Sequence, residues 1–102
     1  MTQLHYDAYF GNLPGLLWCL ENGMDVNVAD NYRGYTAMHW LADMAAVAGP
    51  RIEMLRALVR HGADINIKTP DGITALMLAR AANSDLGDEL AAELIVLGAT
   101  AE

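Results

Sequence analysis

Apolar residues recur at helical spacing in the middle of the chain. The apolar positions there are Ile52, Leu55, Leu58 and Val59. Steps of three, three and one place them on one face of an α-helix rather than on alternate sides of a strand. Pro50 suits the first helical turn, where a missing N–H costs nothing, and Gly62 suits the left-handed position after the last turn. The pattern therefore predicts a helix between these two residues.

Two other segments show the same pattern. Their apolar positions are Leu13, Leu16, Leu17 and Leu20 in the first segment, and Leu90, Leu94 and Ile95 in the second. The candidate starting residues are Asn12 or Leu13 in the first and Ser84 or Asp85 in the second. Each segment stops before a glycine, Gly23 or Gly98, as the middle segment does. We expect a helix in each.

Two shorter segments, 37–44 and 75–82, are rich in alanine and follow a threonine. The hydroxyls of Thr36 and Thr74 are suited to accept a free backbone N–H at a helix start. Thr2 stands in the same relation to the segment that follows it. Short and long helices thus alternate along the chain, which predicts an all-α fold of helix–loop–helix units.

Two phrases of the sequence are nearly the same. GMDVNVADNYRGYTAMHW begins at Gly23 and GADINIKTPDGITALML begins at Gly62, 39 positions later. A third, partial match begins at Gly98. Self-similarity at this period is typical of stacked repeats. We predict a single domain over residues 1–102 with approximate repeats 1–30, 31–68 and 69–102.

These motifs resemble the ankyrin-repeat family. The resemblance rests on G-x-T-A-M-H at 34–39, G-x-T-A-L-M at 72–77, G-M-D-V-N at 23–27 and G-A-D-I-N at 62–66. It implies antiparallel helix pairs stacked into a slightly curved solenoid, with protruding β-turns and a concave side that binds proteins. The histidines His5 and His39 would then be structural, each tying its turn to the next.

The chain departs from this family at several places. Gly34 and Gly72 are 38 positions apart, whereas the family period is about 33 residues, so roughly five extra residues fall around Ala45 to Gly49. Met77 stands where the motif has histidine. Asp7 stands where the family has a buried alanine, and because a lone buried carboxylate is costly, we expect it to be partly exposed or paired.

Composition and charge narrow the class of partner. The chain has six basic and thirteen acidic residues, a net charge of −7, and 54% apolar residues. An acidic globular chain repels phosphate backbones and anionic lipids, so we expect no nucleic-acid or membrane partner. The sequence has no pattern of a secretion signal or membrane span. The single cysteine, Cys19, rules out an internal disulfide, and we expect a cytoplasmic protein.

The sequence contains no arrangement of residues that indicates catalysis. Cys19, His39 and His61 are 20 and 22 positions apart, without the compact pairs of a zinc site. Cys19 lies in an apolar stripe and is interpreted as a core thiol. The glycines occur singly at turns rather than in a phosphate-binding loop. We expect no enzyme activity, no metal and no cofactor.

The candidate partner-binding residues come from the concave side that the resemblance implies. They are Tyr9, Phe10, Tyr32, Arg33, Tyr35, Asp43, Met44, Lys68, Asp71 and Ile73. Tyrosine, phenylalanine and arginine are the side chains that often dominate protein interfaces. Packing between neighbouring turns is the alternative interpretation of the aromatic members. Trp18 and Trp40 are assigned to helix packing.

The predicted function is a non-catalytic module that binds a partner protein, with a basic partner favoured by the acidic charge. Two alternatives stay open. Apolar end faces of the stack would allow self-association, which leaves monomer and weak homodimer as possible states. An inhibitory, immunity-type subunit that covers a basic enzyme is a narrower form of the first prediction.

Overall fold

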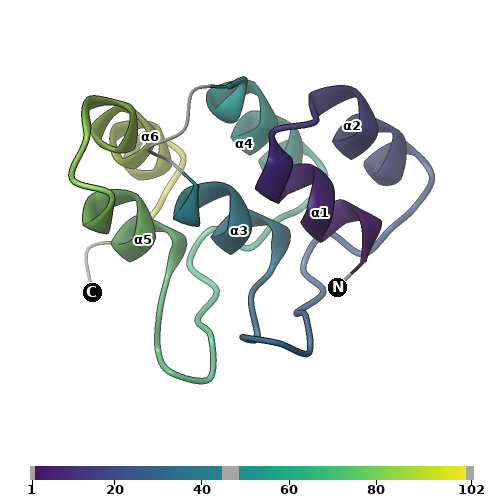
Figure 1. The fold of residues 1–102 in the computed structure, drawn as a ribbon, viewed down its shortest axis with the longest axis horizontal. Helices are drawn as coiled ribbons and strands as arrows, with labels where there is room; N and C mark the ends of the chain where they lie inside the picture. Colours follow the sequence, from purple (N-terminus) through teal and green to yellow (C-terminus); the bar gives the residue numbers. More distant parts are fainter. Residues whose placement is uncertain (1, 45–48, 101–102) are drawn as a thin grey trace.

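The computed structural model describes residues 2–44 and 49–100, and within these ranges the chain forms six α-helices and no strand (Figure 1). The helices are α1 (Gln3–Phe10), α2 (Leu13–Glu21), α3 (Ala37–Asp43), α4 (Arg51–Arg60), α5 (Ala75–Ala81) and α6 (Asp85–Val96). Helices α1, α3 and α5 form one layer, and α2, α4 and α6 form the other. Consecutive helices pair, and the three pairs stack side by side. The predicted all-α solenoid is confirmed.

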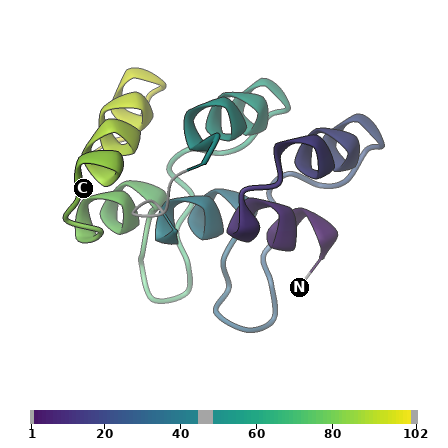
Figure 2. The ribbon, with the colours of Figure 1, turned by 45° about the horizontal axis from the view of Figure 1, so that its top comes forward.

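Two long loops connect the pairs, over residues 22–36 and 61–74. Figure 2 shows both loops projecting from the layer of α1, α3 and α5, so this layer and the loops share one side of the molecule. The repeat boundaries predicted near residues 30 and 68 lie within these loops. We call 22–36 the first loop and 61–74 the second loop.

Helix starts follow the local side-chain chemistry. The hydroxyls of Thr36 and Thr74 accept the N–H of the third helical residue, and the side chains of Asn12 and Ser84 do the same for α2 and α6. These predicted N-caps are confirmed, with Ser84 chosen over Asp85. Pro50 differs from the prediction, since it stands just before α4 rather than in its first turn and provides no side-chain cap.

The histidines tie neighbouring units together, as predicted. His5 Nε2 donates to Val28 O at 2.8 Å, and His39 Nε2 donates to Ile73 O at 3.0 Å. His39 Nδ1 accepts the backbone N–H of Thr36 at 3.0 Å, which fixes the proton on Nε2. Both imidazoles are fully buried. Their hydrogen-bonding capacity is used within the fold.

Asparagines add a second set of bonds between units, which sequence reasoning missed. Asn27 donates to Gly62 O at 3.2 Å and accepts the N–H of Asp64 at 2.8 Å. One unit later, Asn66 makes the same pair of bonds with Gly98 and Thr100. The loops are therefore stacked in register by polar side chains as well as by the apolar core.

Asp7 is buried and paired, so the partly exposed alternative is wrong. Only 2% of its surface is accessible, and its carboxylate accepts from Gln3 Nε2 at 2.9 Å, Asn12 Nδ2 at 3.4 Å and Cys19 Sγ at 3.5 Å. Gly15 leaves room for this carboxylate, because a Cβ there would lie 2.9 Å from the Asp7 carboxyl carbon. Burial, and then the neighbouring carboxylate, raises the pKa of the Cys19 thiol. Cys19 is thus an unreactive core thiol, as predicted.

Arg51 is a buried structural residue that the sequence did not reveal. It is 6% exposed, and its guanidinium donates to Ala8 O at 2.8 Å and Tyr9 O at 3.4 Å. These carbonyls belong to the last turn of α1, which has no helical partners for them. Burial lowers the pKa of Arg51. The start of α4 therefore caps the end of α1.

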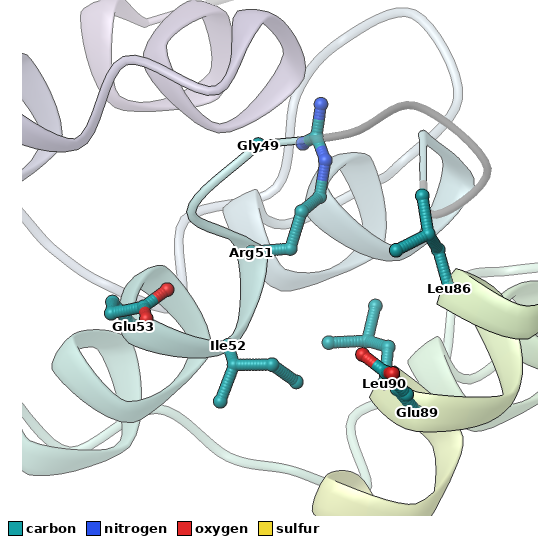
Figure 3. A pocket seen from close by; sticks show the side chains of 7 residues that line it. All are labelled: Gly49, Arg51, Ile52, Glu53, Leu86, Glu89 and Leu90. Atoms are coloured by element: carbon teal, nitrogen blue, oxygen red, sulfur yellow. The ribbon is translucent and has the colours of Figure 1, made fainter.

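The start of α4 also faces the start of α6 across a hollow of about 220 Å³ (Figure 3). Its lining residues are Gly49, Arg51, Ile52, Glu53, Leu86, Glu89 and Leu90. The predicted insertion adjoins this place: Gly49 is exposed, and Ala45 to Ala48 lie outside the described residues. In Figure 3 the Arg51 guanidinium points away from Leu86 and Leu90.

The two tryptophans differ in burial. Trp40 is 5% exposed and belongs to the core, as predicted. Trp18 is 61% exposed, so its assignment to helix packing is wrong. On α2 the buried face carries Leu16, Cys19 and Leu20, and Trp18 projects from the opposite face.

Candidate partner-binding surface

A hollow of about 380 Å³ lies between α1, α3 and the first loop. Its lining residues are Tyr6, Tyr9, Phe10, Tyr32, Arg33, Trp40, Asp43 and Met44. We call it the aromatic pocket, because five of its eight lining residues are aromatic and the whole chain has only seven. It opens on the side of the molecule that carries the loops, near the C-terminal ends of α1 and α3.

The rings in the pocket support one another. Tyr9 packs edge-to-face on Phe10 with centroids 4.9 Å apart, and on Trp40 with centroids 5.4 Å apart. Trp40 in turn packs on Tyr35 at 4.9 Å. Such arrangements are the favoured geometry of aromatic pairs. The pocket wall is therefore held in a defined shape before any partner arrives.

The exposure of the rings divides the pocket into a buried floor and an open rim. Trp40 forms the floor at 5% exposure, whereas Phe10 and Tyr32 are 72% and 73% exposed and Tyr6 is 46% exposed. Large aromatic side chains that stay in water offer apolar area that binding could bury. The rim is thus the part of the pocket suited to contact another molecule.

Asp30 fixes the first loop against the pocket floor. Its Oδ1 accepts four backbone N–H groups, from Tyr32, Arg33, Gly34 and Tyr35, at 2.8 to 3.3 Å. Its Oδ2 accepts the Trp40 Nε1–H. Burial alone would raise the pKa of Asp30, but these donors outweigh it, and the pKa lies below its ordinary value. One ionised carboxylate therefore holds both the loop and the floor.

Two charged side chains border the pocket and do not pair with each other. The Arg33 guanidinium lies over the rings of Tyr32, Tyr35 and Trp40, at 5.3, 5.8 and 5.8 Å from their centroids. Asp43 is half-buried at the end of α3. Within the part of the chain that the structure describes, the Asp43 side chain makes no hydrogen bond and no ion pair.

The structure brings together six of the ten predicted residues and separates four. Tyr9, Phe10, Tyr32, Arg33, Asp43 and Met44 line the aromatic pocket. Tyr35 is 5% exposed, between the rings of Trp40 and His39, so it supports the surface from below instead of forming it. Lys68 and Asp71 are exposed, and Ile73 half-buried, on the second loop.

The second loop lies directly beside the first, because a Cβ at Gly34 would come within 2.5 Å of Pro70 Cδ. Lys68, Asp71 and Ile73 therefore border the same side of the molecule without lining the pocket. Sequence reasoning missed Tyr6, although Tyr6, Tyr9 and Phe10 have the i, i+3, i+4 spacing of one helix face.

A metal centre would need several ligating side chains close together. No three His, Cys, Asp or Glu side chains among the described residues gather closely enough to hold a metal ion. Burial lowers the pKa of His39, whose ring nitrogens bond Thr36 and Ile73. No helix in residues 2–44 and 49–100 has the length and apolar character needed to cross a bilayer.

Comparison with known proteins gives one family. The family model "Ankyrin repeats (3 copies)" matches residues 4–100. An ankyrin repeat-containing protein, P1E11.10, of Schizosaccharomyces pombe is 41% identical over 67% of this chain and 30% of its own length. The human inhibitor of Bruton tyrosine kinase is 29% identical over 74% of the chain and 5% of its own length. Human ankyrin repeat and SOCS box protein 6 is 39% identical over 61% of the chain and 15% of its own length. The chain thus spans less than a third of each of these relatives.

Proposed function

Because this chain belongs to the ankyrin-repeat family, we propose that it binds a partner protein through the side formed by its two loops and by α1, α3 and α5. Ankyrin repeats are generally protein–protein interaction modules, and the family is generally non-enzymatic. In this proposal the aromatic pocket is the centre of the contact. Its role is to take up a side chain of the partner while the loop residues around it position the partner backbone.

The observation that carries the proposal is the concentration of open aromatic rings at one place. Phe10 and Tyr32 keep nearly three quarters of their surface in water, yet both line the same pocket as the buried ring of Trp40. Binding energy in interfaces is concentrated in a few aromatic and arginine side chains at well-packed centres. A rigid pocket also lowers the ordering cost of association.

Residues around the pocket would form the rim of the interface. Asp43 and Met44 border it at the end of α3. Lys68, Asp71 and Ile73 extend the surface onto the second loop. The net charge of −7 favours a basic partner, since opposite charge speeds encounter. The buried thiol of Cys19 accords with a reducing, cytoplasmic setting.

Site-specific crosslinking would test this function. A photoreactive phenylalanine derivative in place of Phe10 should crosslink one partner from a lysate of the source cells, because this position is 72% exposed at the rim. The same group at Trp18, which is 61% exposed on α2, is the matched control. The partner is then made in pure form and its affinity for the chain measured by calorimetry. Equal crosslinking from both positions, or unchanged affinity with Phe10→Ala and Tyr32→Ala, would refute the proposed surface.

An inhibitory subunit is a narrower form of the same proposal. A basic enzyme captured at the pocket would lose activity on titration with the chain, and the inhibition would weaken as salt rises. If the enzyme stays active when it is saturated with the chain, the chain binds the enzyme without inhibiting it.

Self-association is a second candidate, favoured by apolar side chains on the last unit. The exposed ones are Met77 at 42%, Leu86 at 40%, Ile95 at 48% and Val96 at 78%. A repeat stack buries its apolar faces only against neighbours, so this end could pair with a second copy. Light scattering decides between the two: a strict monomer at high concentration removes this candidate, whereas a dimer that Val96→Lys abolishes supports it.

A further inference from the structure

We propose that the aromatic pocket recognises a positively charged side chain, a lysine or arginine of the partner. This inference rests on the proposed function and adds the chemistry of the ligand. The cation would lie over the open rings of α1 and pair with Asp43.

The free rings belong to α1. Arg33 covers the rings of Tyr32 and Trp40, together with buried Tyr35. No cation lies over Tyr6 or Phe10 within the described residues. Cations are attracted to the faces of such rings, most strongly where water is partly excluded. The aromatic rings on the side of the first loop thus already hold a guanidinium. The aromatic rings of α1 hold none.

The negative charge comes from Asp43 and from the helix that carries it. This carboxylate is half-buried, lines the pocket and has no partner in the described structure. It is the last residue of α3, so the partial negative charge of the helix C-terminus adds to it. The equivalent end of α1 is already compensated by Arg51, which donates to Ala8 O and Tyr9 O. Asp43 is therefore a pocket carboxylate that no cation among residues 2–44 and 49–100 pairs with.

The positive charge of Arg33 repels a second cation in the pocket, but its guanidinium lies away from the rings of α1. It is exposed, it lies over the loop-side rings, and it forms no ion pair with Asp43. A neutral apolar side chain would fill the pocket and leave Asp43 unpaired. An acidic side chain would be attracted by the Arg33 guanidinium and repelled by the Asp43 carboxylate. The charge complementarity of the half-buried carboxylate and the overall charge of −7 favour the cation.

Four matched peptides test the preference. Gly-Gly-X-Gly-Gly, with X as lysine, arginine, norleucine or glutamate, is titrated into the Trp18→Phe chain, in which Trp40 in the pocket floor is the only remaining tryptophan. Trp40 fluorescence and amide NMR shifts report binding. We expect the lysine and arginine peptides to bind about fivefold tighter than the norleucine peptide.

Charge variants give the sign of the interaction. Asp43→Asn should remove the preference for lysine over norleucine, and Arg33→Gln should tighten lysine binding about two- to threefold by removing a repulsion. Asp88→Asn is the control and should change nothing, because Asp88 is exposed on α6, in the other helix layer, and does not line the pocket. A norleucine peptide that binds as well as lysine, a glutamate preference that Arg33→Gln abolishes, or no binding at millimolar concentration would each overturn the inference. Crosslinking at Phe10 could still succeed in all three cases, so failure here is distinct from failure of the proposed function.

Discussion

Removing the Asp30 carboxylate should destabilise the protein and loosen the pocket together. Asp30→Ala leaves five donors without their acceptor: four backbone N–H groups of the first loop and the Trp40 Nε1–H. Water can replace the acceptor at Tyr32 and Arg33, which are exposed. It cannot readily do so at Tyr35 and Trp40, which are each 5% exposed.

The magnitude follows from the two buried donors. Leaving a buried donor unsatisfied costs about 1–3 kcal/mol, so the Ala variant should lose about 4 kcal/mol of unfolding free energy. Asp30→Asn keeps one oxygen, now neutral, for the loop N–H groups but places an NH₂ group, itself a donor, against the Trp40 Nε1–H. Because hydrogen bonds to a charged acceptor are roughly twice as strong as neutral ones, its loss should be about 2 kcal/mol.

Urea unfolding followed by circular dichroism and by tryptophan fluorescence measures this loss. With a slope of about 1–2 kcal/mol per molar urea for a chain of this size, the Ala variant should unfold at a midpoint lower by about 2–4 M. The control is Asp71→Ala, an exposed aspartate on the second loop. That change should stay within about 0.5 kcal/mol.

The pH dependence provides an independent check of the same reasoning. The pKa of Asp30 is lower in the folded chain, so the stability that its charge contributes is complete above the unfolded pKa of about 3.9 and is lost as pH falls through the folded value. The gap between the wild type and Asp30→Asn should therefore narrow as pH is lowered from 5 toward 3. The other carboxylates are common to both proteins, so their contributions to the pH dependence cancel in the difference. A midpoint for Asp30→Ala equal to that of the Asp71 control, or a gap that is constant with pH, would show that the carboxylate does not hold the loop.

Three other changes separate structural residues from surface residues. Tyr35→Ala should cost about 3 kcal/mol of stability by leaving a cavity, whereas Phe10→Ala should cost under about 0.5 kcal/mol and weaken partner binding by about 2 kcal/mol. Urea midpoints measure the stability of the two variants, and calorimetry with the crosslinked partner measures their affinity. The reverse pattern would contradict the assignment of Tyr35 to the core and of Phe10 to the surface. Arg51→Met should lower unfolding free energy by about 2–4 kcal/mol, because it leaves the Ala8 carbonyl buried without a donor; an unchanged midpoint would show that α1 needs no such cap. Burial lowers the pKa of His39, so the unfolded chain binds the proton more readily and stability should fall as pH drops below about 6.5; if His39→Gln shows the same fall between pH 7.5 and 5.5 in urea titrations, another group is responsible.

Helix ends were predictable because their chemistry is local. A threonine, asparagine or serine ahead of an apolar run accepts an N–H three residues later, and Thr36, Asn12 and Ser84 all do so. The exposure of Trp18 was also within reach of the sequence. At 3.6 residues per turn, it lies opposite Leu16 and Leu20, and only its apolar character suggested burial.

Contacts between distant segments were beyond such reasoning. Arg51 bonds a carbonyl 43 positions earlier, and nothing in its own neighbourhood distinguishes it from exposed Arg56 or Arg60. The sequence indicated that burying the Asp7 carboxylate would be costly, but it could not identify the partners of that carboxylate. Cys19 reaches Asp7 only when α2 folds back on α1. The partners of a buried charge depend on tertiary packing, which the helical pattern leaves undetermined.

The aromatic pocket combines both kinds of information. The repeat frame placed Tyr9, Phe10 and Asp43 on one side because helix phase and loop position follow from the sequence. It could not show that one residue, Asp30, accepts hydrogen bonds both from the first loop and from Trp40 in the pocket floor. In the proposed function, stability and recognition belong to different residues: Asp30 and Trp40 are buried and hold the shape, whereas Tyr32 is 73% exposed and contributes little to it. The rim can therefore change its side chains, and with them its partner, without a large cost to the fold that presents them.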